Sequence, residues 1–163
     1  MTNLLLLVML LPVKPMPVRK DMRAFLDSMA FQESSGNQKA INKWGMLGLY
    51  QFSPATLKAM RVKVSKKQFL NNKHLQDSVM VAYMRDNWTN LHKYYKLVGK
   101  KHKGIKITKS GLLAMAHLVG LTGVCAEFNP KRCQHITKDA NGTTATKYLA
   151  KFAGYQITLP KVK

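Results

Sequence analysis

Apolar residues recur at helical spacing in several segments of this chain, and most of these segments begin at a residue that can cap a helix. The first stripe is Met22, Phe25, Leu26 and Met29, at positions i, i+3, i+4 and i+7 directly after Asp21. Patterning of this kind predicts helices that bury one face against other helices. The sequence therefore indicates a mainly α protein.

Residues that start or stop helices divide the rest of the chain. The expected elements are an end of the first helix at Gly36, helices that start at Ser53-Pro54, at Ser65 and at Ser110, one long helix from Leu75 to Val98, and a last helix from Thr143 or Thr144 to Gly154. Residues 100–109 are predicted to form a basic loop with a short extended piece at 105–107. No alternation of strands and helices and no internal repeat is visible, so we predict one compact helical domain.

The first 20 of the 163 residues differ from the remainder. They hold an apolar run from Leu4 to Leu11 and then three prolines. The run is too short to cross a bilayer as a helix. It also lacks the preceding basic residues and the small-residue cleavage site of a signal peptide. We therefore expect an apolar, proline-rich segment over residues 1–20, a folded domain over residues 21–163, and no transmembrane span.

Positive charge dominates the composition, with 27 Lys and Arg against 7 Asp and Glu and a formal net charge of +20. A hydrophobic content of 46% excludes a disordered basic tail. This charge indicates a polyanionic partner, which could be nucleic acid, an anionic membrane or an anionic cell-wall polymer. The lysines are spread over several segments rather than gathered with aromatic residues on one face, so we expect no nucleic-acid partner.

The two cysteines, Cys125 and Cys133, are too few for a disulfide framework. With His117 and His135 they could be imagined as zinc ligands, but the C-x-x-C spacing of zinc sites is missing. We expect neither a metal nor another cofactor. The cysteines are then either two free thiols or one disulfide.

Glu33 is one of only two glutamates in the chain. It follows Met29 by four residues and Ala30 by three, which places it on the buried face at the C-terminal end of the first helix. Partial burial and the negative end of the helix dipole both disfavour the charged carboxylate, as a general acid working near neutral pH requires. The alternative is a helix-end glutamate that faces solvent or pairs with a lysine.

A glycine-containing loop follows this acid. Residues 34–37 have the composition of a turn, and Gly45 and Gly48 allow close approach of the backbone. Tyr50 and Gln51 then lead into the next helix. We interpret the loop as one wall of a cleft, because amides, hydroxyls and aromatic rings suit sugar recognition. The alternative is that Tyr50 simply packs in the core.

Three blocks, Glu-Ser-Ser-Gly-Asn at 33–37, Gly-Leu-Tyr-Gln at 48–51 and Pro-Ala-Thr at 54–56, stand in this order. Together they resemble the active-site signature of the soluble lytic transglycosylases, which belong to the lysozyme-like superfamily of peptidoglycan-cleaving enzymes. Residues 116–120 partly match the later Ala-Tyr-Asn-x-Gly element of that superfamily, and residues 139–155 resemble the end of short phage-encoded lysozyme-like domains. The resemblance implies a single lysozyme-like catalytic domain.

The resemblance also implies roles for single residues. Glu33 matches the catalytic acid of the family, and Ser34, Tyr50 and Gln51 match positions that line the sugar cleft. His117 falls where the family has a Tyr-Asn pair that helps to hold the acid and the substrate, and we include it among the candidate substrate-binding residues.

The reaction implied by the resemblance uses one carboxylate. Glu33 would protonate the oxygen between N-acetylmuramic acid and N-acetylglucosamine and would then take a proton from the C6 hydroxyl, leaving a 1,6-anhydro sugar. A muramidase that hydrolyses the same bond would use a second carboxylate. Asp139 and Glu127 are the candidates, although we expect Asp139 to cap the turn at Asn141-Gly142 and Glu127 to end a short surface helix.

One alternative to these enzymes is a catalytically inactive structural virion protein of the same fold. Another is a nucleic-acid-binding module, which the spread of the lysines over several segments disfavours. We expect the partner to be the glycan strands of peptidoglycan, with other virion or envelope proteins meeting the N-terminal segment. The expected location is a virion or the cell envelope, after synthesis in the cytoplasm.

Overall fold

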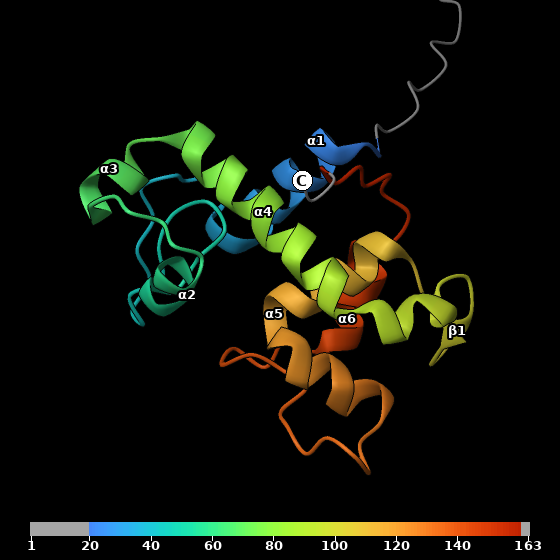
Figure 1. Cartoon of the computed structure of the whole chain (residues 1–163). Coiled ribbons are helices and arrows are strands. Elements are labelled where there is room, and N and C mark those ends of the chain that lie inside the picture. Colours follow the sequence, from blue (N-terminus) through green and yellow to red (C-terminus); the bar gives the residue numbers. More distant parts are fainter. Residues whose placement is uncertain (1–19, 161–163) are drawn as a thin grey trace, which may run out of the picture.

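The computed structural model of the chain describes residues 20–160. Figure 1 shows this part as a set of helices joined by loops, with one very short hairpin. The prediction of a mainly α fold is confirmed. The apolar, proline-rich segment predicted for residues 1–20 lies, apart from Lys20, outside the described residues.

Helix α1, Met22–Ser34, forms where the first apolar stripe predicts it. The Asp21 side chain accepts a hydrogen bond from the backbone N–H of Ala24 and caps the first turn. At the other end, Ser35 adopts a left-handed conformation with φ 53°, and the N–H of Gly36 donates to the carbonyl of Ala30. The stripe is buried, because the Phe25 and Met29 side chains are inaccessible to solvent.

Two short helices follow, α2 at Pro54–Ala59 and α3 at Lys66–Leu70. Ser53 caps α2, with Pro54 as its first residue, and Ser65 and Gln68 form a reciprocal capping box at α3. The predicted starts of both helices are therefore confirmed.

Helix α4, Lys73–Asn90, ends earlier than expected. The chain continues as a separate 3₁₀ helix, η1, His92–Leu97, so the prediction of one helix from Leu75 to Val98 is wrong. The reason lies at the junction, where the Tyr95 ring stacks on the Trp88 ring at 4.1 Å and its hydroxyl donates to the Trp88 carbonyl. These contacts favour the tighter 3₁₀ turn at this point.

Strands β1, Lys101–His102, and β2, Ile105–Lys106, form an antiparallel hairpin inside the predicted basic loop. Helix α5, Lys109–Phe128, begins after its cap residue Thr108, one residue before the predicted start at Ser110. It contains a kink at Gly120, whose φ of 67° and ψ of 177° are not helical. Helix α6, Ala145–Lys151, starts after the cap residue Thr144, one of its two predicted starts, and packs against α5.

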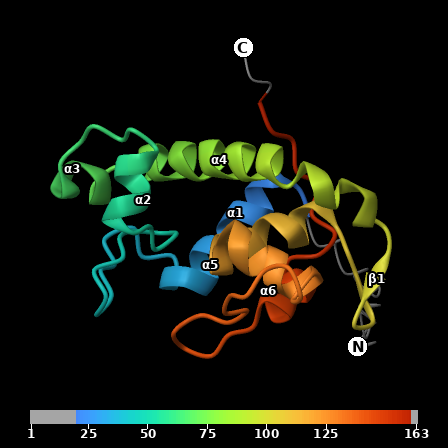
Figure 2. The same ribbon diagram turned by 60° about the horizontal axis from the view of Figure 1, so that its bottom comes forward.

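The long helix α4 connects two ends of the molecule, as Figures 1 and 2 both show. The α2 and α3 helices lie at one end, and α5, α6 and the hairpin lie at the other. Two apolar clusters fill the interior. One includes Phe25, Phe52, Phe69 and Met80, and the other includes Leu112, Met115 and Leu149.

Helix α5 has the length and hydropathy of a membrane span, and it is the one helix with these properties within residues 20–160. However, 61% of its apolar stretch is buried inside the protein, as in a core helix. The disulfide between Cys125 and Cys133 joins the end of α5 to the following loop, which settles the open question about the thiols.

Candidate active site

Glu33 lies at the end of α1 and faces a cleft of about 580 Å³, a volume within the roughly 300–1,000 Å³ of typical ligand sites. Its side chain is 16% exposed. The predicted position of this acid, on the buried face at the C-terminal end of the first helix, is therefore correct. The alternative of a glutamate that faces solvent or pairs with a lysine does not hold, since most of the side chain is covered and no lysine contacts it among the described residues.

Tyr148 is the closest polar partner of this acid. Its hydroxyl, on α6, donates a hydrogen bond of 2.7 Å to Oε1 of Glu33. Burial, and then the negative charge of Glu33, raise the pKa of the Tyr148 hydroxyl above its usual range, so it remains a donor at neutral pH. The spacing of residues in the last helix places Tyr148 on its apolar face, and no signal in the sequence points to this contact.

His117 approaches the same oxygen from α5, with Nε2 3.7 Å from Oε1 of Glu33. This distance is a close contact and is too long for a hydrogen bond. The His117 side chain is 8% exposed and packs edge-on against Phe52 and Tyr83, with ring centroids 5.7 and 5.8 Å away. The kink at Gly120 follows three residues later. His117 thus lines the cleft beside the acid.

The loop that forms the opposite wall is closed like a hairpin. Leu47 and Phe52 exchange two backbone hydrogen bonds of 2.9 and 3.0 Å, and residues 48–51 form the turn between them. The buried Gln76 side chain accepts a bond from the Leu49 N–H and leaves no room for a side chain at Gly48. Gln51 turns toward the cleft with φ 50°, and its amide donates to the Gly48 carbonyl.

Two predicted cleft residues lie elsewhere. Tyr50 is fully buried, and its hydroxyl donates to Asp77 at 2.5 Å. Asp77 also accepts a bond from Arg23, so Tyr50 connects the loop to α1 and α4 instead of lining the cleft. Ser34 does not line it either, because its hydroxyl donates to the carbonyls of Ala30 and Leu49. Both residues hold the loop against the helix that carries Glu33.

Asp139 is the second carboxylate that lines the cleft. Its Oδ1 accepts bonds from the N–H groups of Asn141 and Thr143, which confirms the expected capping of this turn. Glu127, the other candidate, is outside the cleft, and its side chain is only 5% exposed. The expectation of a short surface helix was wrong, because α5 continues through the Gly120 kink and buries this residue.

The remaining lining of the cleft suits a sugar polymer. It offers amide and hydroxyl groups for hydrogen bonds and the half-exposed Trp44 ring as an apolar surface. No group of three or more His, Cys, Asp or Glu residues that could hold a metal ion occurs within residues 20–160. The chemistry that the site offers is proton transfer at Glu33 in a partly covered, polar groove.

Comparison with known protein families gave a match to the model of the transglycosylase SLT domain over residues 18–99. No curated protein and no solved structure matched the chain. The matched range contains Glu33 and the loop at 48–51, whereas His117 and Tyr148 lie beyond it. Since this match covers half of the sequence, the chain belongs to the transglycosylase SLT family of the lysozyme-like superfamily, which supports a peptidoglycan-degrading function.

Proposed function

We propose that this protein cleaves the β-1,4 bond between N-acetylmuramic acid and N-acetylglucosamine in peptidoglycan, as a lytic transglycosylase with Glu33 as acid and base. The observation that carries the proposal is the hydrogen bond from Tyr148 to Oε1 of Glu33 inside a cleft of a chain from the SLT family. This bond occupies one carboxyl oxygen, and Oε2 has no hydrogen-bond partner among the described residues. Oε2 is therefore the oxygen that faces the substrate.

The chemistry follows from this arrangement. Protonated Glu33 gives its proton from Oε2 to the glycosidic oxygen as the C1–O bond breaks, and positive charge develops at C1 of the muramic acid. The resulting carboxylate then takes the proton of the C6 hydroxyl, and O6 bonds to C1. Glu33 regains its proton and no water is consumed. Tyr148 donates to Oε1 throughout and holds the orientation of the carboxyl group.

Asp139 favours a second candidate, a muramidase of the same fold. It lines the same cleft as Glu33, and inverting glycosidases place a second carboxylate across the bond to activate water. In this reaction Glu33 keeps the role of acid. The transglycosylase is preferred because both bonds made by the Asp139 side chain, to Asn141 and Thr143, involve its own turn.

The location and origin of the protein belong to the same proposal. We infer that the chain is phage-encoded and acts from a virion or at the cell envelope, where the N-terminal segment meets other proteins. The support is the resemblance of residues 139–155 to short phage-encoded lysozyme-like domains. A test is extraction of phage particles followed by detection of the chain with a specific antibody.

Replacement of Glu33 tests the proposed reaction. Glu33→Gln keeps the size of the side chain but cannot donate the proton, so we expect a loss of about 10²–10⁴-fold in the rate of turbidity loss of purified cell walls. The matched control is Asp86→Asn, which alters an exposed carboxylate that pairs with its neighbour Arg85. An active Glu33→Gln variant would refute the assignment. A wild-type protein that is inactive on walls of several types would favour the structural virion protein.

A further inference from the structure

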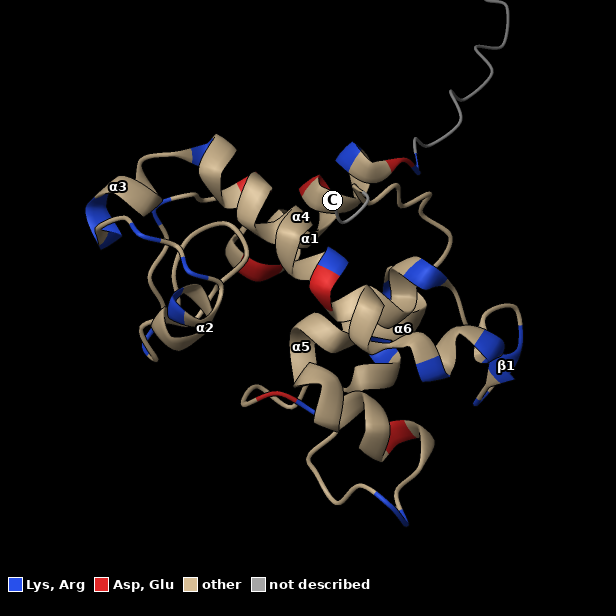
Figure 3. Ribbon diagram, in the orientation of Figure 1, with Lys and Arg blue, Asp and Glu red and all other residues tan. Residues whose placement is uncertain are grey.

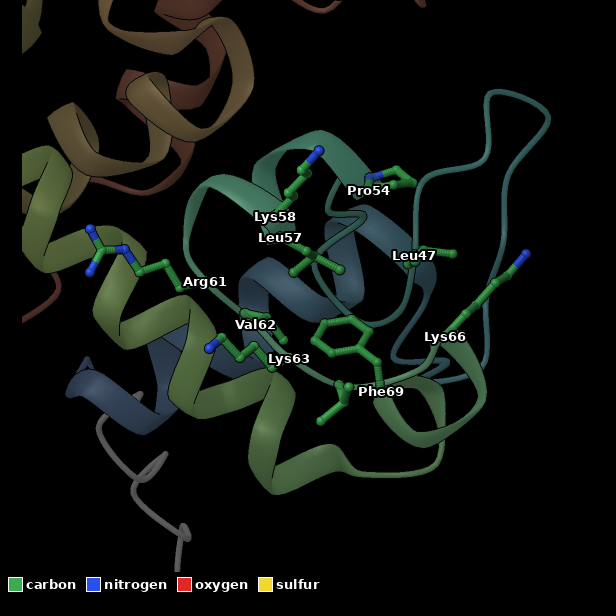
Figure 4. Close-up of a pocket in the computed structure, with 10 residues that line it drawn as sticks. Leu47, Pro54, Leu57, Lys58, Arg61, Val62, Lys63, Lys66 and Phe69 are labelled. Atoms are coloured by element: carbon green, nitrogen blue, oxygen red, sulfur yellow. The ribbon is translucent and has the colours of Figure 1, made fainter.

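A second pocket of about 480 Å³ is lined by other residues of α2 than those that line the cleft. Its floor is apolar and includes Leu57, Val62 and Phe69 (Figure 4). Four exposed cations, Lys58, Arg61, Lys63 and Lys66, surround this floor. No ion pair joins any of the four to an acid within residues 20–160.

The surroundings of this pocket are cationic over a long stretch of chain. Residues 34–76, here called the basic lobe, contain eight Lys and Arg and no Asp or Glu. Figure 3 shows only positive charge along α2 and α3. If these charges served only to keep the protein soluble, positive and negative side chains would be mixed on this surface. The basic lobe therefore favours a ligand with several negative charges.

The floor restricts the apolar part of such a ligand. Phe69 is 1% exposed and Leu57 is 8% exposed, so both side chains are already covered by the core. A long acyl chain would need to displace core side chains, whereas small methyl groups can lie on the floor as it stands. The pocket thus fits a molecule that combines carboxylates with small apolar side chains.

We propose that this pocket binds the peptide stem of peptidoglycan, which carries free carboxylates and the methyl groups of alanine. The inference rests on the proposed function, since it assigns a second subsite for the same substrate. The cleft and the pocket share α2, with Thr56 lining the cleft and Leu57 and Lys58 lining the pocket. A four-residue stem reaches about 14 Å, at roughly 3.3–3.6 Å per residue, which exceeds the ~10–12 Å diameter of a helix. A stem attached to a glycan in the cleft can therefore pass around α2.

The test measures binding of a synthetic stem, N-acetyl-L-Ala-γ-D-Glu-diaminopimelate-D-Ala, to the Glu33→Gln protein by NMR titration. We expect shifts at Leu57 and Val62 and at least about tenfold weaker binding for the triple variant Lys58→Gln, Lys63→Gln and Lys66→Gln. The matched control removes three exposed charges elsewhere, with Lys96→Gln, Lys100→Gln and Lys101→Gln, and should bind as before. A stem whose carboxylates are converted to amides should bind the Glu33→Gln protein about as weakly as the unmodified stem binds the triple variant.

Absence of stem binding, or equal binding by the triple variant, overturns the inference. Binding of phosphatidylglycerol vesicles that depends on the same three lysines, without stem binding, would assign the pocket to a lipid surface and overturn it too. The result is separable from the proposed function because stem binding requires no cleavage. An enzyme that cuts glycan without binding the stem refutes only the subsite, and a stem-binding protein that cuts nothing refutes only the reaction.

Discussion

The only two glutamates of the chain occupy the same place in their helices and have opposite surroundings. Glu33 is the residue before the last of α1, and Glu127 is the residue before the last of α5. Glu33 receives a hydrogen bond from a neutral tyrosine and faces a cleft. Glu127 accepts bonds from Lys103 at 2.6 Å and His102 at 2.8 Å and joins α5 to the hairpin. A position at the end of a helix therefore does not determine the role of a glutamate, which depends on the side chains that contact it.

The two environments also differ in electrostatics. Burial alone would raise the pKa of Glu127, but the hydrogen bonds and positive charge of Lys103 and His102 outweigh it, so its pKa lies below the usual range. A carboxyl group held in this way stays ionised and cannot act as an acid near neutral pH. Glu33 has no cationic lysine or arginine against it among the described residues.

The largest expected contrast is that replacement of Glu33 lowers the rate of catalysis, whereas replacement of Glu127 lowers stability. Glu127→Gln removes the buried negative charge that Lys103 and His102 contact, and we expect a loss of about 1.5 kcal/mol in the free energy of unfolding. For a protein of this size the melting temperature falls by about 3–6 °C. Cleavage of cell walls below the melting temperature should stay close to wild type.

The measurement is thermal unfolding by circular dichroism, with Glu33→Gln melting near the wild type. The comparison breaks if Glu127→Gln abolishes cleavage while the protein stays folded, since Glu127 would then belong to the active site. Because Glu127→Gln is expected to lower stability, it is a poor control for the effect of Glu33→Gln on activity, and Asp86→Asn serves better.

A smaller effect is expected from the hydroxyl that distinguishes the surroundings of Glu33. Tyr148→Phe removes one hydrogen bond, worth about 1 kcal/mol, so we expect about a three- to tenfold lower rate of cleavage. The control Tyr95→Phe removes a bond of the same length to the Trp88 carbonyl, between two residues that do not line the cleft, and should leave the rate unchanged. Equal rates for Tyr148→Phe and the wild type would show that Tyr148 does not orient the acid.

The sequence predicts the features that depend on neighbouring residues and not the contacts between distant ones. The first helix, its caps and the position of Glu33 follow from residues close together in the chain. Tyr148 is 115 residues from Glu33, and on the apolar face of a helix it is indistinguishable from a core tyrosine. The length of α5 was also hidden, because Gly120 resembles a helix end and here is a kink. Tyr50 faces the core because its hydroxyl donates a hydrogen bond to Asp77. The composition of the loop does not reveal this partner.

The smallest predicted effect concerns pH. The folded pKa of Glu127 is lower than its unfolded value, so the unfolded chain binds more protons as the pH falls and stability decreases. This contribution is complete above the unfolded pKa and is lost as the pH falls through the folded pKa. Urea unfolding between about pH 6 and pH 3 should show the gap between wild type and Glu127→Gln closing. A gap that stays constant or widens on acidification would contradict the ion-pair account.

The central claim is that Glu33 breaks the glycan by transferring a proton, without water. The most direct measurement is mass spectrometry of the muropeptides released from purified peptidoglycan by the wild type and by Glu33→Gln. The account predicts 1,6-anhydro muropeptides from the wild type and a loss of these products in the variant. Products with reducing ends would instead assign hydrolysis, with Asp139 as the second carboxylate. Undiminished anhydro products from Glu33→Gln would contradict the claim itself.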